Sequence, residues 1–172
     1  MPTDTIYGIV GSALSKSVVE RIYDIRKRAP QKPCIILIGD INELHEFSIH
    51  LSDKQKEKLE EYWSFDVTQD LRPTSIILDC NDYRFSYLHR GTKTLAFRIP
   101  LNLELRNLLK QTGPLIAPSA NPEGLLPAQN IEEAKKYFAE AVSLYVDGGE
   151  ITGKASKIIR LNSDGSTFTI RD

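Results

Sequence analysis

The chain has 172 residues, of which 41% are hydrophobic and 26% are charged; these are ordinary globular proportions and exclude a fibrous or disordered chain. Its 22 basic and 23 acidic residues leave a net charge of −1, so no overall field attracts nucleic acid. The length predicts one well-buried domain over residues 1–172, and no apolar stretch approaches the roughly 20 residues that span a bilayer.

Hydrophobic periodicity and capping residues predict the elements of the first half of the chain. In order, these are a strand at 5–12, a helix from about 18 to 28, a strand at 34–38, a short helix around 43–49, a helix from 53 to about 63 and a strand at 75–78. Ser52 and Gln55, three residues apart, form a capping box for the helix that begins at 53. The first half therefore alternates strands and helices.

The second half continues this pattern and ends differently. In order, we expect a strand at 94–99, a helix from Asn102 to Gly113, a strand at 115–117, a helix capped by Asn130 and Glu133 that runs to 138, a strand at 144–146, and strands at 156–161 and 167–170. Asp164-Gly165 joins the last two strands as a hairpin. Alternation followed by a hairpin predicts an α/β fold with a mixed sheet.

Two short polar segments, Pro2 to Gly8 and Pro118 to Asn121 with Gly124 shortly after, lie beside apolar strands. Each combines small hydroxyl or amide side chains with Pro or Gly, as in a turn whose backbone approaches a polar ligand. They are either ordinary turns or parts of a site at the strand ends, where α/β sheets bind ligands.

A basic cluster precedes the strand at 34–38. Arg26, Lys27, Arg28 and Lys32 fall within seven residues with no acid among them. Cations favour the C-terminal ends of helices, so the cluster is either a solvated helix end or an anion site at the mouth of a buried strand.

Other reactive residue types form no recognisable set. Cys34 and Cys80 are too few for a disulfide framework or a zinc site, and Cys34, within an apolar run, is expected to be a buried, inert thiol. The histidines are expected to have surface or structural roles: His45, His50 and His89. The start lacks the basic and apolar regions of a secretory signal, which predicts a cytoplasmic protein.

Six segments in register make the chain resemble the YrdC/Sua5 family, also called TsaC, the threonylcarbamoyl-AMP synthases of tRNA modification. They are Pro2 to Gly8, Arg26-Lys27-Arg28, Leu95 to Pro100, Pro118 to Asn121 with Gly124, Asp147-Gly148-Gly149 and Ser156 to Ile159. The resemblance covers almost the whole chain. It implies a YrdC-like twisted mixed sheet flanked by helices, with a central concave cleft.

The resemblance also implies a reaction in which L-threonine, bicarbonate and ATP give threonylcarbamoyl-AMP and pyrophosphate, with Mg²⁺ on the ATP phosphates. The product would serve the t6A modification of tRNA through a downstream threonylcarbamoyl-transferase machinery. No side-chain nucleophile is required, so positioning and charge stabilisation would supply most of the catalysis. The chain agrees, since it contains no evident Ser/His/Asp set, and no catalytic residue or metal ligand is assigned.

Carried over position by position, the resemblance implies two groups of binding residues. The threonine site would contain Thr3, Thr5, Arg98 and Ser156. The ATP site would contain Arg26, Arg28, Lys32, Thr94, Ser119, Asn121 and Arg171. Arg98 suits the threonine carboxylate because a planar guanidinium can grip it through two hydrogen bonds; a structural ion pair is the alternative role.

Three departures from the family pattern change the expectations. The family has a helix and a strand before its Pro-Thr motif, whereas Met1 precedes Pro2 here; we therefore expect an exposed apolar face and either low stability or a homodimer. Arg26 replaces the usual lysine, which keeps the charge but widens the cationic group. The segment Asp70 to Pro73 replaces Trp-Pro-Gly-Pro, so that loop should follow a different path.

Two other functions remain open. The chain could be a YrdC-like module that binds tRNA, double-stranded RNA or nucleotide with little synthase activity, recognisable by salt-dependent RNA affinity without adenylate formation. It could also resemble the carbamoyl-adenylate domain of hydrogenase maturation proteins. Those proteins carry zinc-finger segments, and no Cys-x-x-Cys occurs here.

Overall fold

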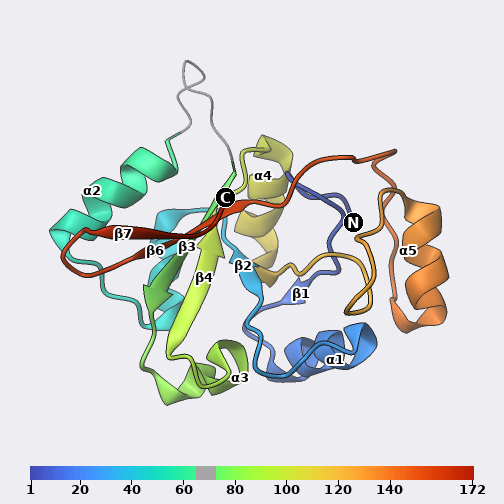
Figure 1. The fold of residues 1–172 in the computed structure, drawn as a ribbon, viewed down its shortest axis with the longest axis horizontal. Helices are drawn as coiled ribbons and strands as arrows, with labels where there is room; N and C mark the ends of the chain where they lie inside the picture. The colour runs from blue at the N-terminus through green and yellow to red at the C-terminus, as the bar shows by residue number, and fades with distance from the viewer. Residues whose placement is uncertain (65–72) are drawn as a thin grey trace.

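A mixed sheet forms the centre of the computed structural model, which describes residues 1–64 and 73–172 (Figure 1). Within these residues seven strands lie in the order β1 (Gly11–Ser12), β5 (Leu115–Ile116), β2 (Ile35–Leu37), β4 (Thr94–Arg98), β3 (Thr74–Asp79), β6 (Lys157–Leu161) and β7 (Thr167–Arg171). The pairs β2/β4 and β3/β6 are parallel and the others antiparallel. The predicted α/β fold with a mixed sheet is therefore confirmed, and the structure shows that this sheet is open.

The helices begin and end where capping residues allow. They are α1 (Lys16–Arg26), α2 (Asp53–Tyr62), α3 (Ser86–His89), α4 (Leu103–Thr112) and α5 (Ile131–Phe138). The capping box of Ser52 with Gln55 is present, and the Asn102 and Asn130 side chains accept hydrogen bonds from backbone amides three residues on. The α1 helix ends two residues earlier than predicted, because Lys27 adopts the left-handed conformation with φ of 51°.

Four parts of the secondary-structure prediction are wrong. The expected strand at 5–12 is regular only over Gly11–Ser12, since residues 2–8 form a turn. The helix expected around 43–49 is a 3-10 helix, Ile41–Phe47. The strand expected at 144–146 is irregular, and the short helices within residues 83–89 were missed. Such short elements carry too few residues for periodicity to identify them.

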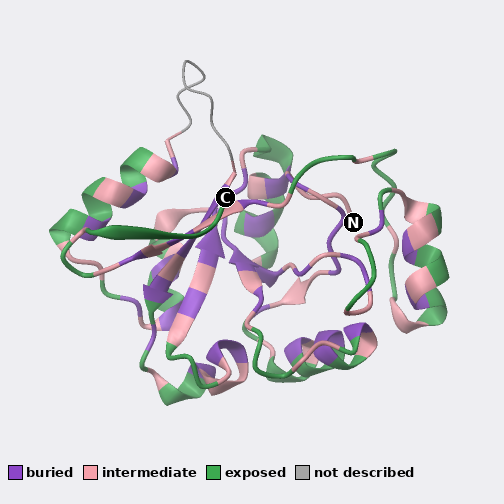
Figure 2. Cartoon of the chain, in the orientation of Figure 1, coloured by how far each residue is buried: buried purple, intermediate pink, exposed green. Residues whose placement is uncertain are grey.

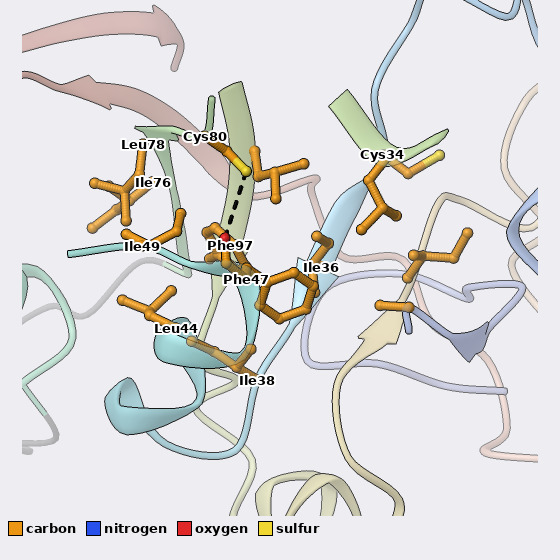
Figure 3. Close-up of a cluster of buried hydrophobic side chains, with 14 of the residues drawn as sticks. Cys34, Ile36, Ile38, Leu44, Phe47, Ile49, Ile76, Leu78, Cys80 and Phe97 are labelled. Carbon is orange, nitrogen blue, oxygen red and sulfur yellow. Dashed lines mark hydrogen bonds between the residues drawn. The ribbon is translucent and has the colours of Figure 1, made fainter. Parts of the chain in front are cut away.

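Buried side chains concentrate in the central strands, whereas β7 is exposed along its whole length (Figure 2). In the core, the Phe47 ring packs edge-on against Phe97 with centroids 5.1 Å apart. The Cys80 thiol donates to the Phe47 carbonyl at 3.6 Å (Figure 3), and burial raises its pKa. Cys34 is free and buried, as predicted. None of the described helices has both the length and the apolar character needed to cross a membrane.

An apolar groove of about 380 Å³ lies beside α1 and the chain after α5. Its apolar lining includes Val18, Ile22, Ile25, Phe138 and Val142. The N-terminal ammonium of Met1 donates to the Gly8 carbonyl at 2.9 Å at the margin of this groove. The expected low stability or dimerisation stays a prediction. The altered loop expected at Asp70 to Pro73 falls, except for Pro73, outside the described residues.

Candidate functional site

One cavity of about 190 Å³ lies where distant parts of the chain meet. Its lining comes from the N-terminal turn, the loop between α1 and β2, the C-terminal end of β4, the loop after β5, and the residues around β6 and β7. Six of the predicted site residues line it: Thr5, Arg28, Arg98, Ser119, Ser156 and Arg171. The other five do not: Thr3, Arg26, Lys32, Thr94 and Asn121. Three arginines and no carboxylate in the lining make the cavity suited to an anionic ligand.

Arg98 forms a buried ion pair with Asp4, a residue that the sequence analysis did not assign to the site. Its Nη2 lies 2.9 Å from Asp4 Oδ1 and 3.3 Å from Thr5 Oγ1, and the side chains of this ion pair are only 4% and 3% exposed. Asp4 Oδ2 also accepts from the Leu101 amide. Burial lowers the pKa of Arg98 while Asp4 raises it, and arginine stays cationic throughout. Arg98 therefore has a structural partner and also lines the cavity; its binding of the threonine carboxylate stays a prediction.

Thr3 shapes the N-terminal turn. Its hydroxyl donates to the Ile6 carbonyl at 2.6 Å and accepts from the amides of Thr5 and Ile6, each at 3.3 Å. It also lies 3.1 Å from Thr5 Oγ1. A hydroxyl that captures the local backbone in this way competes with strand formation, which explains why residues 5–10 do not continue as a strand. Thr3 thus positions Thr5, which faces the cavity.

Arg26 braces the loop that carries Ser119. The residue is only 2% exposed; its Nε donates to the Asn121 carbonyl at 2.9 Å, and its Nη2 donates to Asn121 Oδ1 and Ser119 Oγ, each at 3.1 Å. Burial lowers its pKa. Its Nη1 is buried without a hydrogen-bond partner among the described residues. Arg26 therefore stabilises this loop through its hydrogen bonds. The Asn121 amide does the same, since its Nδ2 donates to the Pro122 and Leu125 carbonyls.

Arg28 and Lys32 of the basic cluster also have partners. Arg28 lines the cavity while its Nε and Nη2 donate to the carbonyls of Lys32 and Pro33, both at 3.0 Å. The Lys32 ammonium pairs with Glu123, whose other carboxylate oxygen accepts from the Ala29 amide. The hydrogen bond from Lys32 is the main reason that the pKa of Glu123 is lowered. An internal carboxylate therefore occupies part of the predicted anion site.

Thr94 is not brought to the cavity. It begins β4, whereas Arg98 ends the same strand. At about 3.3 Å per residue along a strand, the two residues are roughly 13 Å apart, and the Thr94 hydroxyl donates to Thr92 Oγ1 at 3.1 Å.

Ser156 and Arg171 form the side of the cavity at β6 and β7. Arg171 donates to the Ser156 carbonyl from Nε at 3.1 Å and from Nη2 at 2.7 Å. The Ser156 hydroxyl lies 2.8 Å from the hydroxyl of Ser75 on β3. Both serines are buried, with 2% and 0% exposure.

A strap, residues 142–155, runs from the end of α5 across the N-terminal turn to β6 (Figure 1). The Tyr7 hydroxyl donates to the Gly149 carbonyl and accepts from the Gly148 amide, both at 2.8 Å. Further along, a side chain on Gly153 would place its Cβ 2.1 Å from the Thr5 carbonyl oxygen. Because the strap touches the turn that carries Thr5, it fixes one side of the cavity.

Sequence reasoning missed four residues of this arrangement: Asp4, Tyr7, Ser75 and Glu123. Asp4 and Tyr7 belong to the motif Pro2 to Gly8, and Glu123 lies between Asn121 and Gly124, so a polar side chain within a motif segment was the available signal. Ser75 gave a weaker signal, a single hydroxyl in the apolar run 75–78.

A protein-family model, Sua5/YciO/YrdC, described as "Telomere recombination", matches residues 1–172. The chain is 29% identical over 150 residues to a threonylcarbamoyl-AMP synthase of Bacillus subtilis, covering 86% of this chain and 41% of that protein. It is 26% identical to a putative threonylcarbamoyl-AMP synthase of Mycobacterium tuberculosis, covering 93% and 76%. The solved structure of Sua5 from P. abyssi complexed with L-threonine superposes with a TM-score of 0.83 at 24% identity, covering 99% of this chain and 48% of that one. The chain thus spans about two fifths to three quarters of these proteins.

Proposed function

The chain belongs to the Sua5/YciO/YrdC family, and from this premise we propose that it is a threonylcarbamoyl-AMP synthase, a nucleotidyltransferase that forms threonylcarbamoyl-AMP and pyrophosphate from L-threonine, bicarbonate and ATP. Its product would be consumed by a transferase that modifies tRNA. The names of the relatives support this proposal, as does the solved relative's complex with L-threonine.

The observation that carries the proposal is the convergence of Thr5, Arg98 and Ser156 with Arg28 and Ser119 on one cavity. These residues come from five separate segments, so a purely local role does not explain their meeting. The volume of about 190 Å³ is below the roughly 300 to 1,000 Å³ of typical small-molecule sites. We therefore assign this small cavity to the amino acid, with the nucleotide extending past Arg28 and Ser119.

The chemistry needs positioned charges rather than a nucleophilic side chain. The neutral threonine amine attacks the carbon of bicarbonate; a C–N bond forms, a C–O bond of bicarbonate breaks, and the departing oxygen leaves as water with one proton from the amine, which gives a carbamate. A carbamate oxygen then attacks the α-phosphorus of ATP, and the bond from that phosphorus to the bridging oxygen breaks, so pyrophosphate leaves. Arg98 would neutralise the threonine carboxylate and Arg28 the developing phosphate charge, which is catalysis by orientation and electrostatics.

Mg²⁺ is expected to accompany ATP, and the residues of the cavity do not form a site for it on their own. Among the residues that the structure describes, no group of three or more His, Cys, Asp or Glu side chains could hold a metal ion. Mg²⁺ often binds through substrate phosphates and water, with only one or two protein carboxylates. We therefore derive no step of the reaction from a protein-bound metal.

The proposal is tested by measuring pyrophosphate release from ATP with threonine and bicarbonate supplied or withheld. We expect release only when both are present, and an adenylate product that contains threonine. Pyrophosphate release that does not depend on threonine would contradict the proposal. Salt-dependent RNA binding without adenylate formation would instead support the RNA-binding alternative.

Two arginine variants provide a matched control for this assay. Arg28→Ala removes a cation from the cavity and should raise the KM for ATP about tenfold or more, as expected for a lost charge-assisted contact. Arg84→Ala removes a surface arginine that pairs with Asp82 and should leave the kinetics unchanged. Equal effects of the two substitutions would show that Arg28 acts only through overall charge.

Glu123→Gln is expected to tighten the binding of ATP. The Glu123 carboxylate pairs with Lys32 beside the cavity, so a polyphosphate must compete with it for that ammonium. Glutamine keeps the size of the side chain and removes the charge. We expect the Kd for ATP to fall about two- to fivefold, in keeping with an exposed ion pair, with the larger change at low salt.

Isothermal titration of a non-hydrolysable ATP analogue at two salt concentrations measures this effect. Glu132→Gln is the control, since Glu132 pairs with Lys135 on α5 and does not line the cavity. Weaker ATP binding by Glu123→Gln would show that the carboxylate supports the nucleotide site rather than competing with the phosphates.

A further inference from the structure

Ser75 is a buried hydroxyl with one polar contact. It lies on β3 with 0% exposure, and it does not line the cavity. Among the described residues, its hydroxyl has a single hydrogen-bond partner, Ser156 Oγ at 2.8 Å. Ser156 does line the cavity. The pair therefore connects the core of the sheet to the candidate site.

The environment of this pair fixes the direction of the hydrogen bond. A buried donor left without an acceptor costs about 1 to 3 kcal/mol, and among the residues that the structure describes the Ser75 proton has only Ser156 Oγ as an acceptor. Ser75 must therefore donate. The other neighbour of Ser156 Oγ is Arg171 Nη2 at 3.4 Å, and a guanidinium can only donate. Both neighbours of Ser156 Oγ are thus donors, so the proton of Ser156 is left for a ligand.

From this geometry we propose that Ser75 is a positioning residue that makes Ser156 a hydrogen-bond donor toward the cavity. Ser156 then binds an oxygen acceptor of the substrate, a carboxylate or carbamate oxygen, and does not accept a hydrogen bond from the amine. This assignment deepens the proposed function and rests on it for the identity of the substrate. It adds a residue of β3 to the site.

The charges around the cavity support an anionic acceptor at this position. Arg28, Arg98 and Arg171 line the same space, and no lining residue is a carboxylate. Asp4 reaches Arg98 from outside that lining. A donor hydroxyl beside three guanidinium groups adds to a site for negatively charged oxygens, whereas a cationic amine would meet only like charges there.

Ser75→Thr and Ser75→Val form a matched pair for the test. Threonine and valine have nearly the same shape, but threonine carries a hydroxyl where valine carries a methyl group. Any strain from the bulk added to Ser75 is therefore common to both variants. We expect Ser75→Val to raise the KM for threonine about fivefold to tenfold relative to Ser75→Thr, because the Ser156 proton is no longer directed. The Kd for the ATP analogue should be equal in the two variants.

A ligand series separates this role from a general loss of structure. Threoninol keeps the amine and side-chain hydroxyl of threonine and lacks its carboxylate. Binding of threoninol should be the same in the two variants, while binding of threonine falls in Ser75→Val. Equal threonine binding by both variants, in a chain whose wild type binds threonine, would overturn the role of Ser75. A wild type that binds no threonine would instead contradict the proposed function.

Neutron diffraction from crystals exchanged into D₂O tests the hydrogen-bond direction without any substrate. We expect a deuterium bonded to Ser75 Oγ that points to Ser156 Oγ. A deuterium bonded to Ser156 Oγ that points to Ser75 would overturn the inference, whatever reaction the protein catalyses.

Discussion

Replacing Asp4 with alanine is expected to lower the free energy of unfolding by about 3 to 5 kcal/mol, the usual consequence of leaving a buried charge without its partner. Asp4 and Arg98 are 3% and 4% exposed and lie 2.9 Å apart. Within residues 1–64 and 73–172, the guanidinium would then keep only its longer contact with Thr5 Oγ1 at 3.3 Å. Such a loss is large beside a typical total stability of about 5 to 15 kcal/mol.

Urea unfolding measures this effect, with Glu132→Ala as the control. Glu132 forms an ion pair with Lys135 in which both side chains are about half or more exposed, at 70% and 49%. Exposed pairs contribute little to stability, so the control should unfold close to wild type. A loss of stability in Asp4→Ala no larger than in the control would show that Arg98 finds another partner or water.

The double variant Asp4→Ala/Arg98→Met distinguishes stability from function. Removing both charges should recover part of the stability lost in Asp4→Ala, because no buried charge remains unpaired. Threonine binding should stay weak, since the cation proposed for its carboxylate is gone, while ATP binding should be largely kept. A double variant that binds threonine as wild type would show that the role of Arg98 is structural alone.

Gly153→Ala is expected to lower kcat/KM by about 100-fold, the scale reported for misplacing a site by about 1 Å. The added Cβ would lie 2.1 Å from the Thr5 carbonyl oxygen and 3.2 Å from the carbonyl carbon. Backbone atoms cannot give way as a flexible side chain does, so the strap must move away from the turn that carries Thr5. Ser156 follows directly after the strap and would move with it.

Stability should change little in this variant, because residues 152–154 of the strap are exposed and segments with few buried contacts open at low cost. Thr152→Ala is the matched control, since it alters the neighbouring residue without adding an atom next to Thr5. Steady-state kinetics measure kcat/KM of the two variants, and urea unfolding measures their free energy of unfolding. Unchanged kinetics in Gly153→Ala would mean that the strap does not set the geometry of the cavity.

The sequence by itself determined the features that depend on near neighbours along the chain. Apolar runs and caps placed β2, β3, β4 and four of the helices, because periodicity and capping are local properties. The turn chemistry of Asp164-Gly165 placed the final hairpin. The resemblance to the family also implied site roles for Arg28, Arg98, Ser119 and Ser156, which the fold brings to one cavity.

Only the tertiary structure decided how each polar group is used. Arg26 and Arg28 are two residues apart in the same cluster, yet Arg26 is buried against Ser119 and Asn121 while Arg28 lines the cavity. The partners of the key groups are distant in sequence: Asp4 for Arg98, Glu123 for Lys32 and Ser75 for Ser156. Such pairings depend on strand order and on the path of the strap, because a buried polar group takes whichever partner the fold brings within reach.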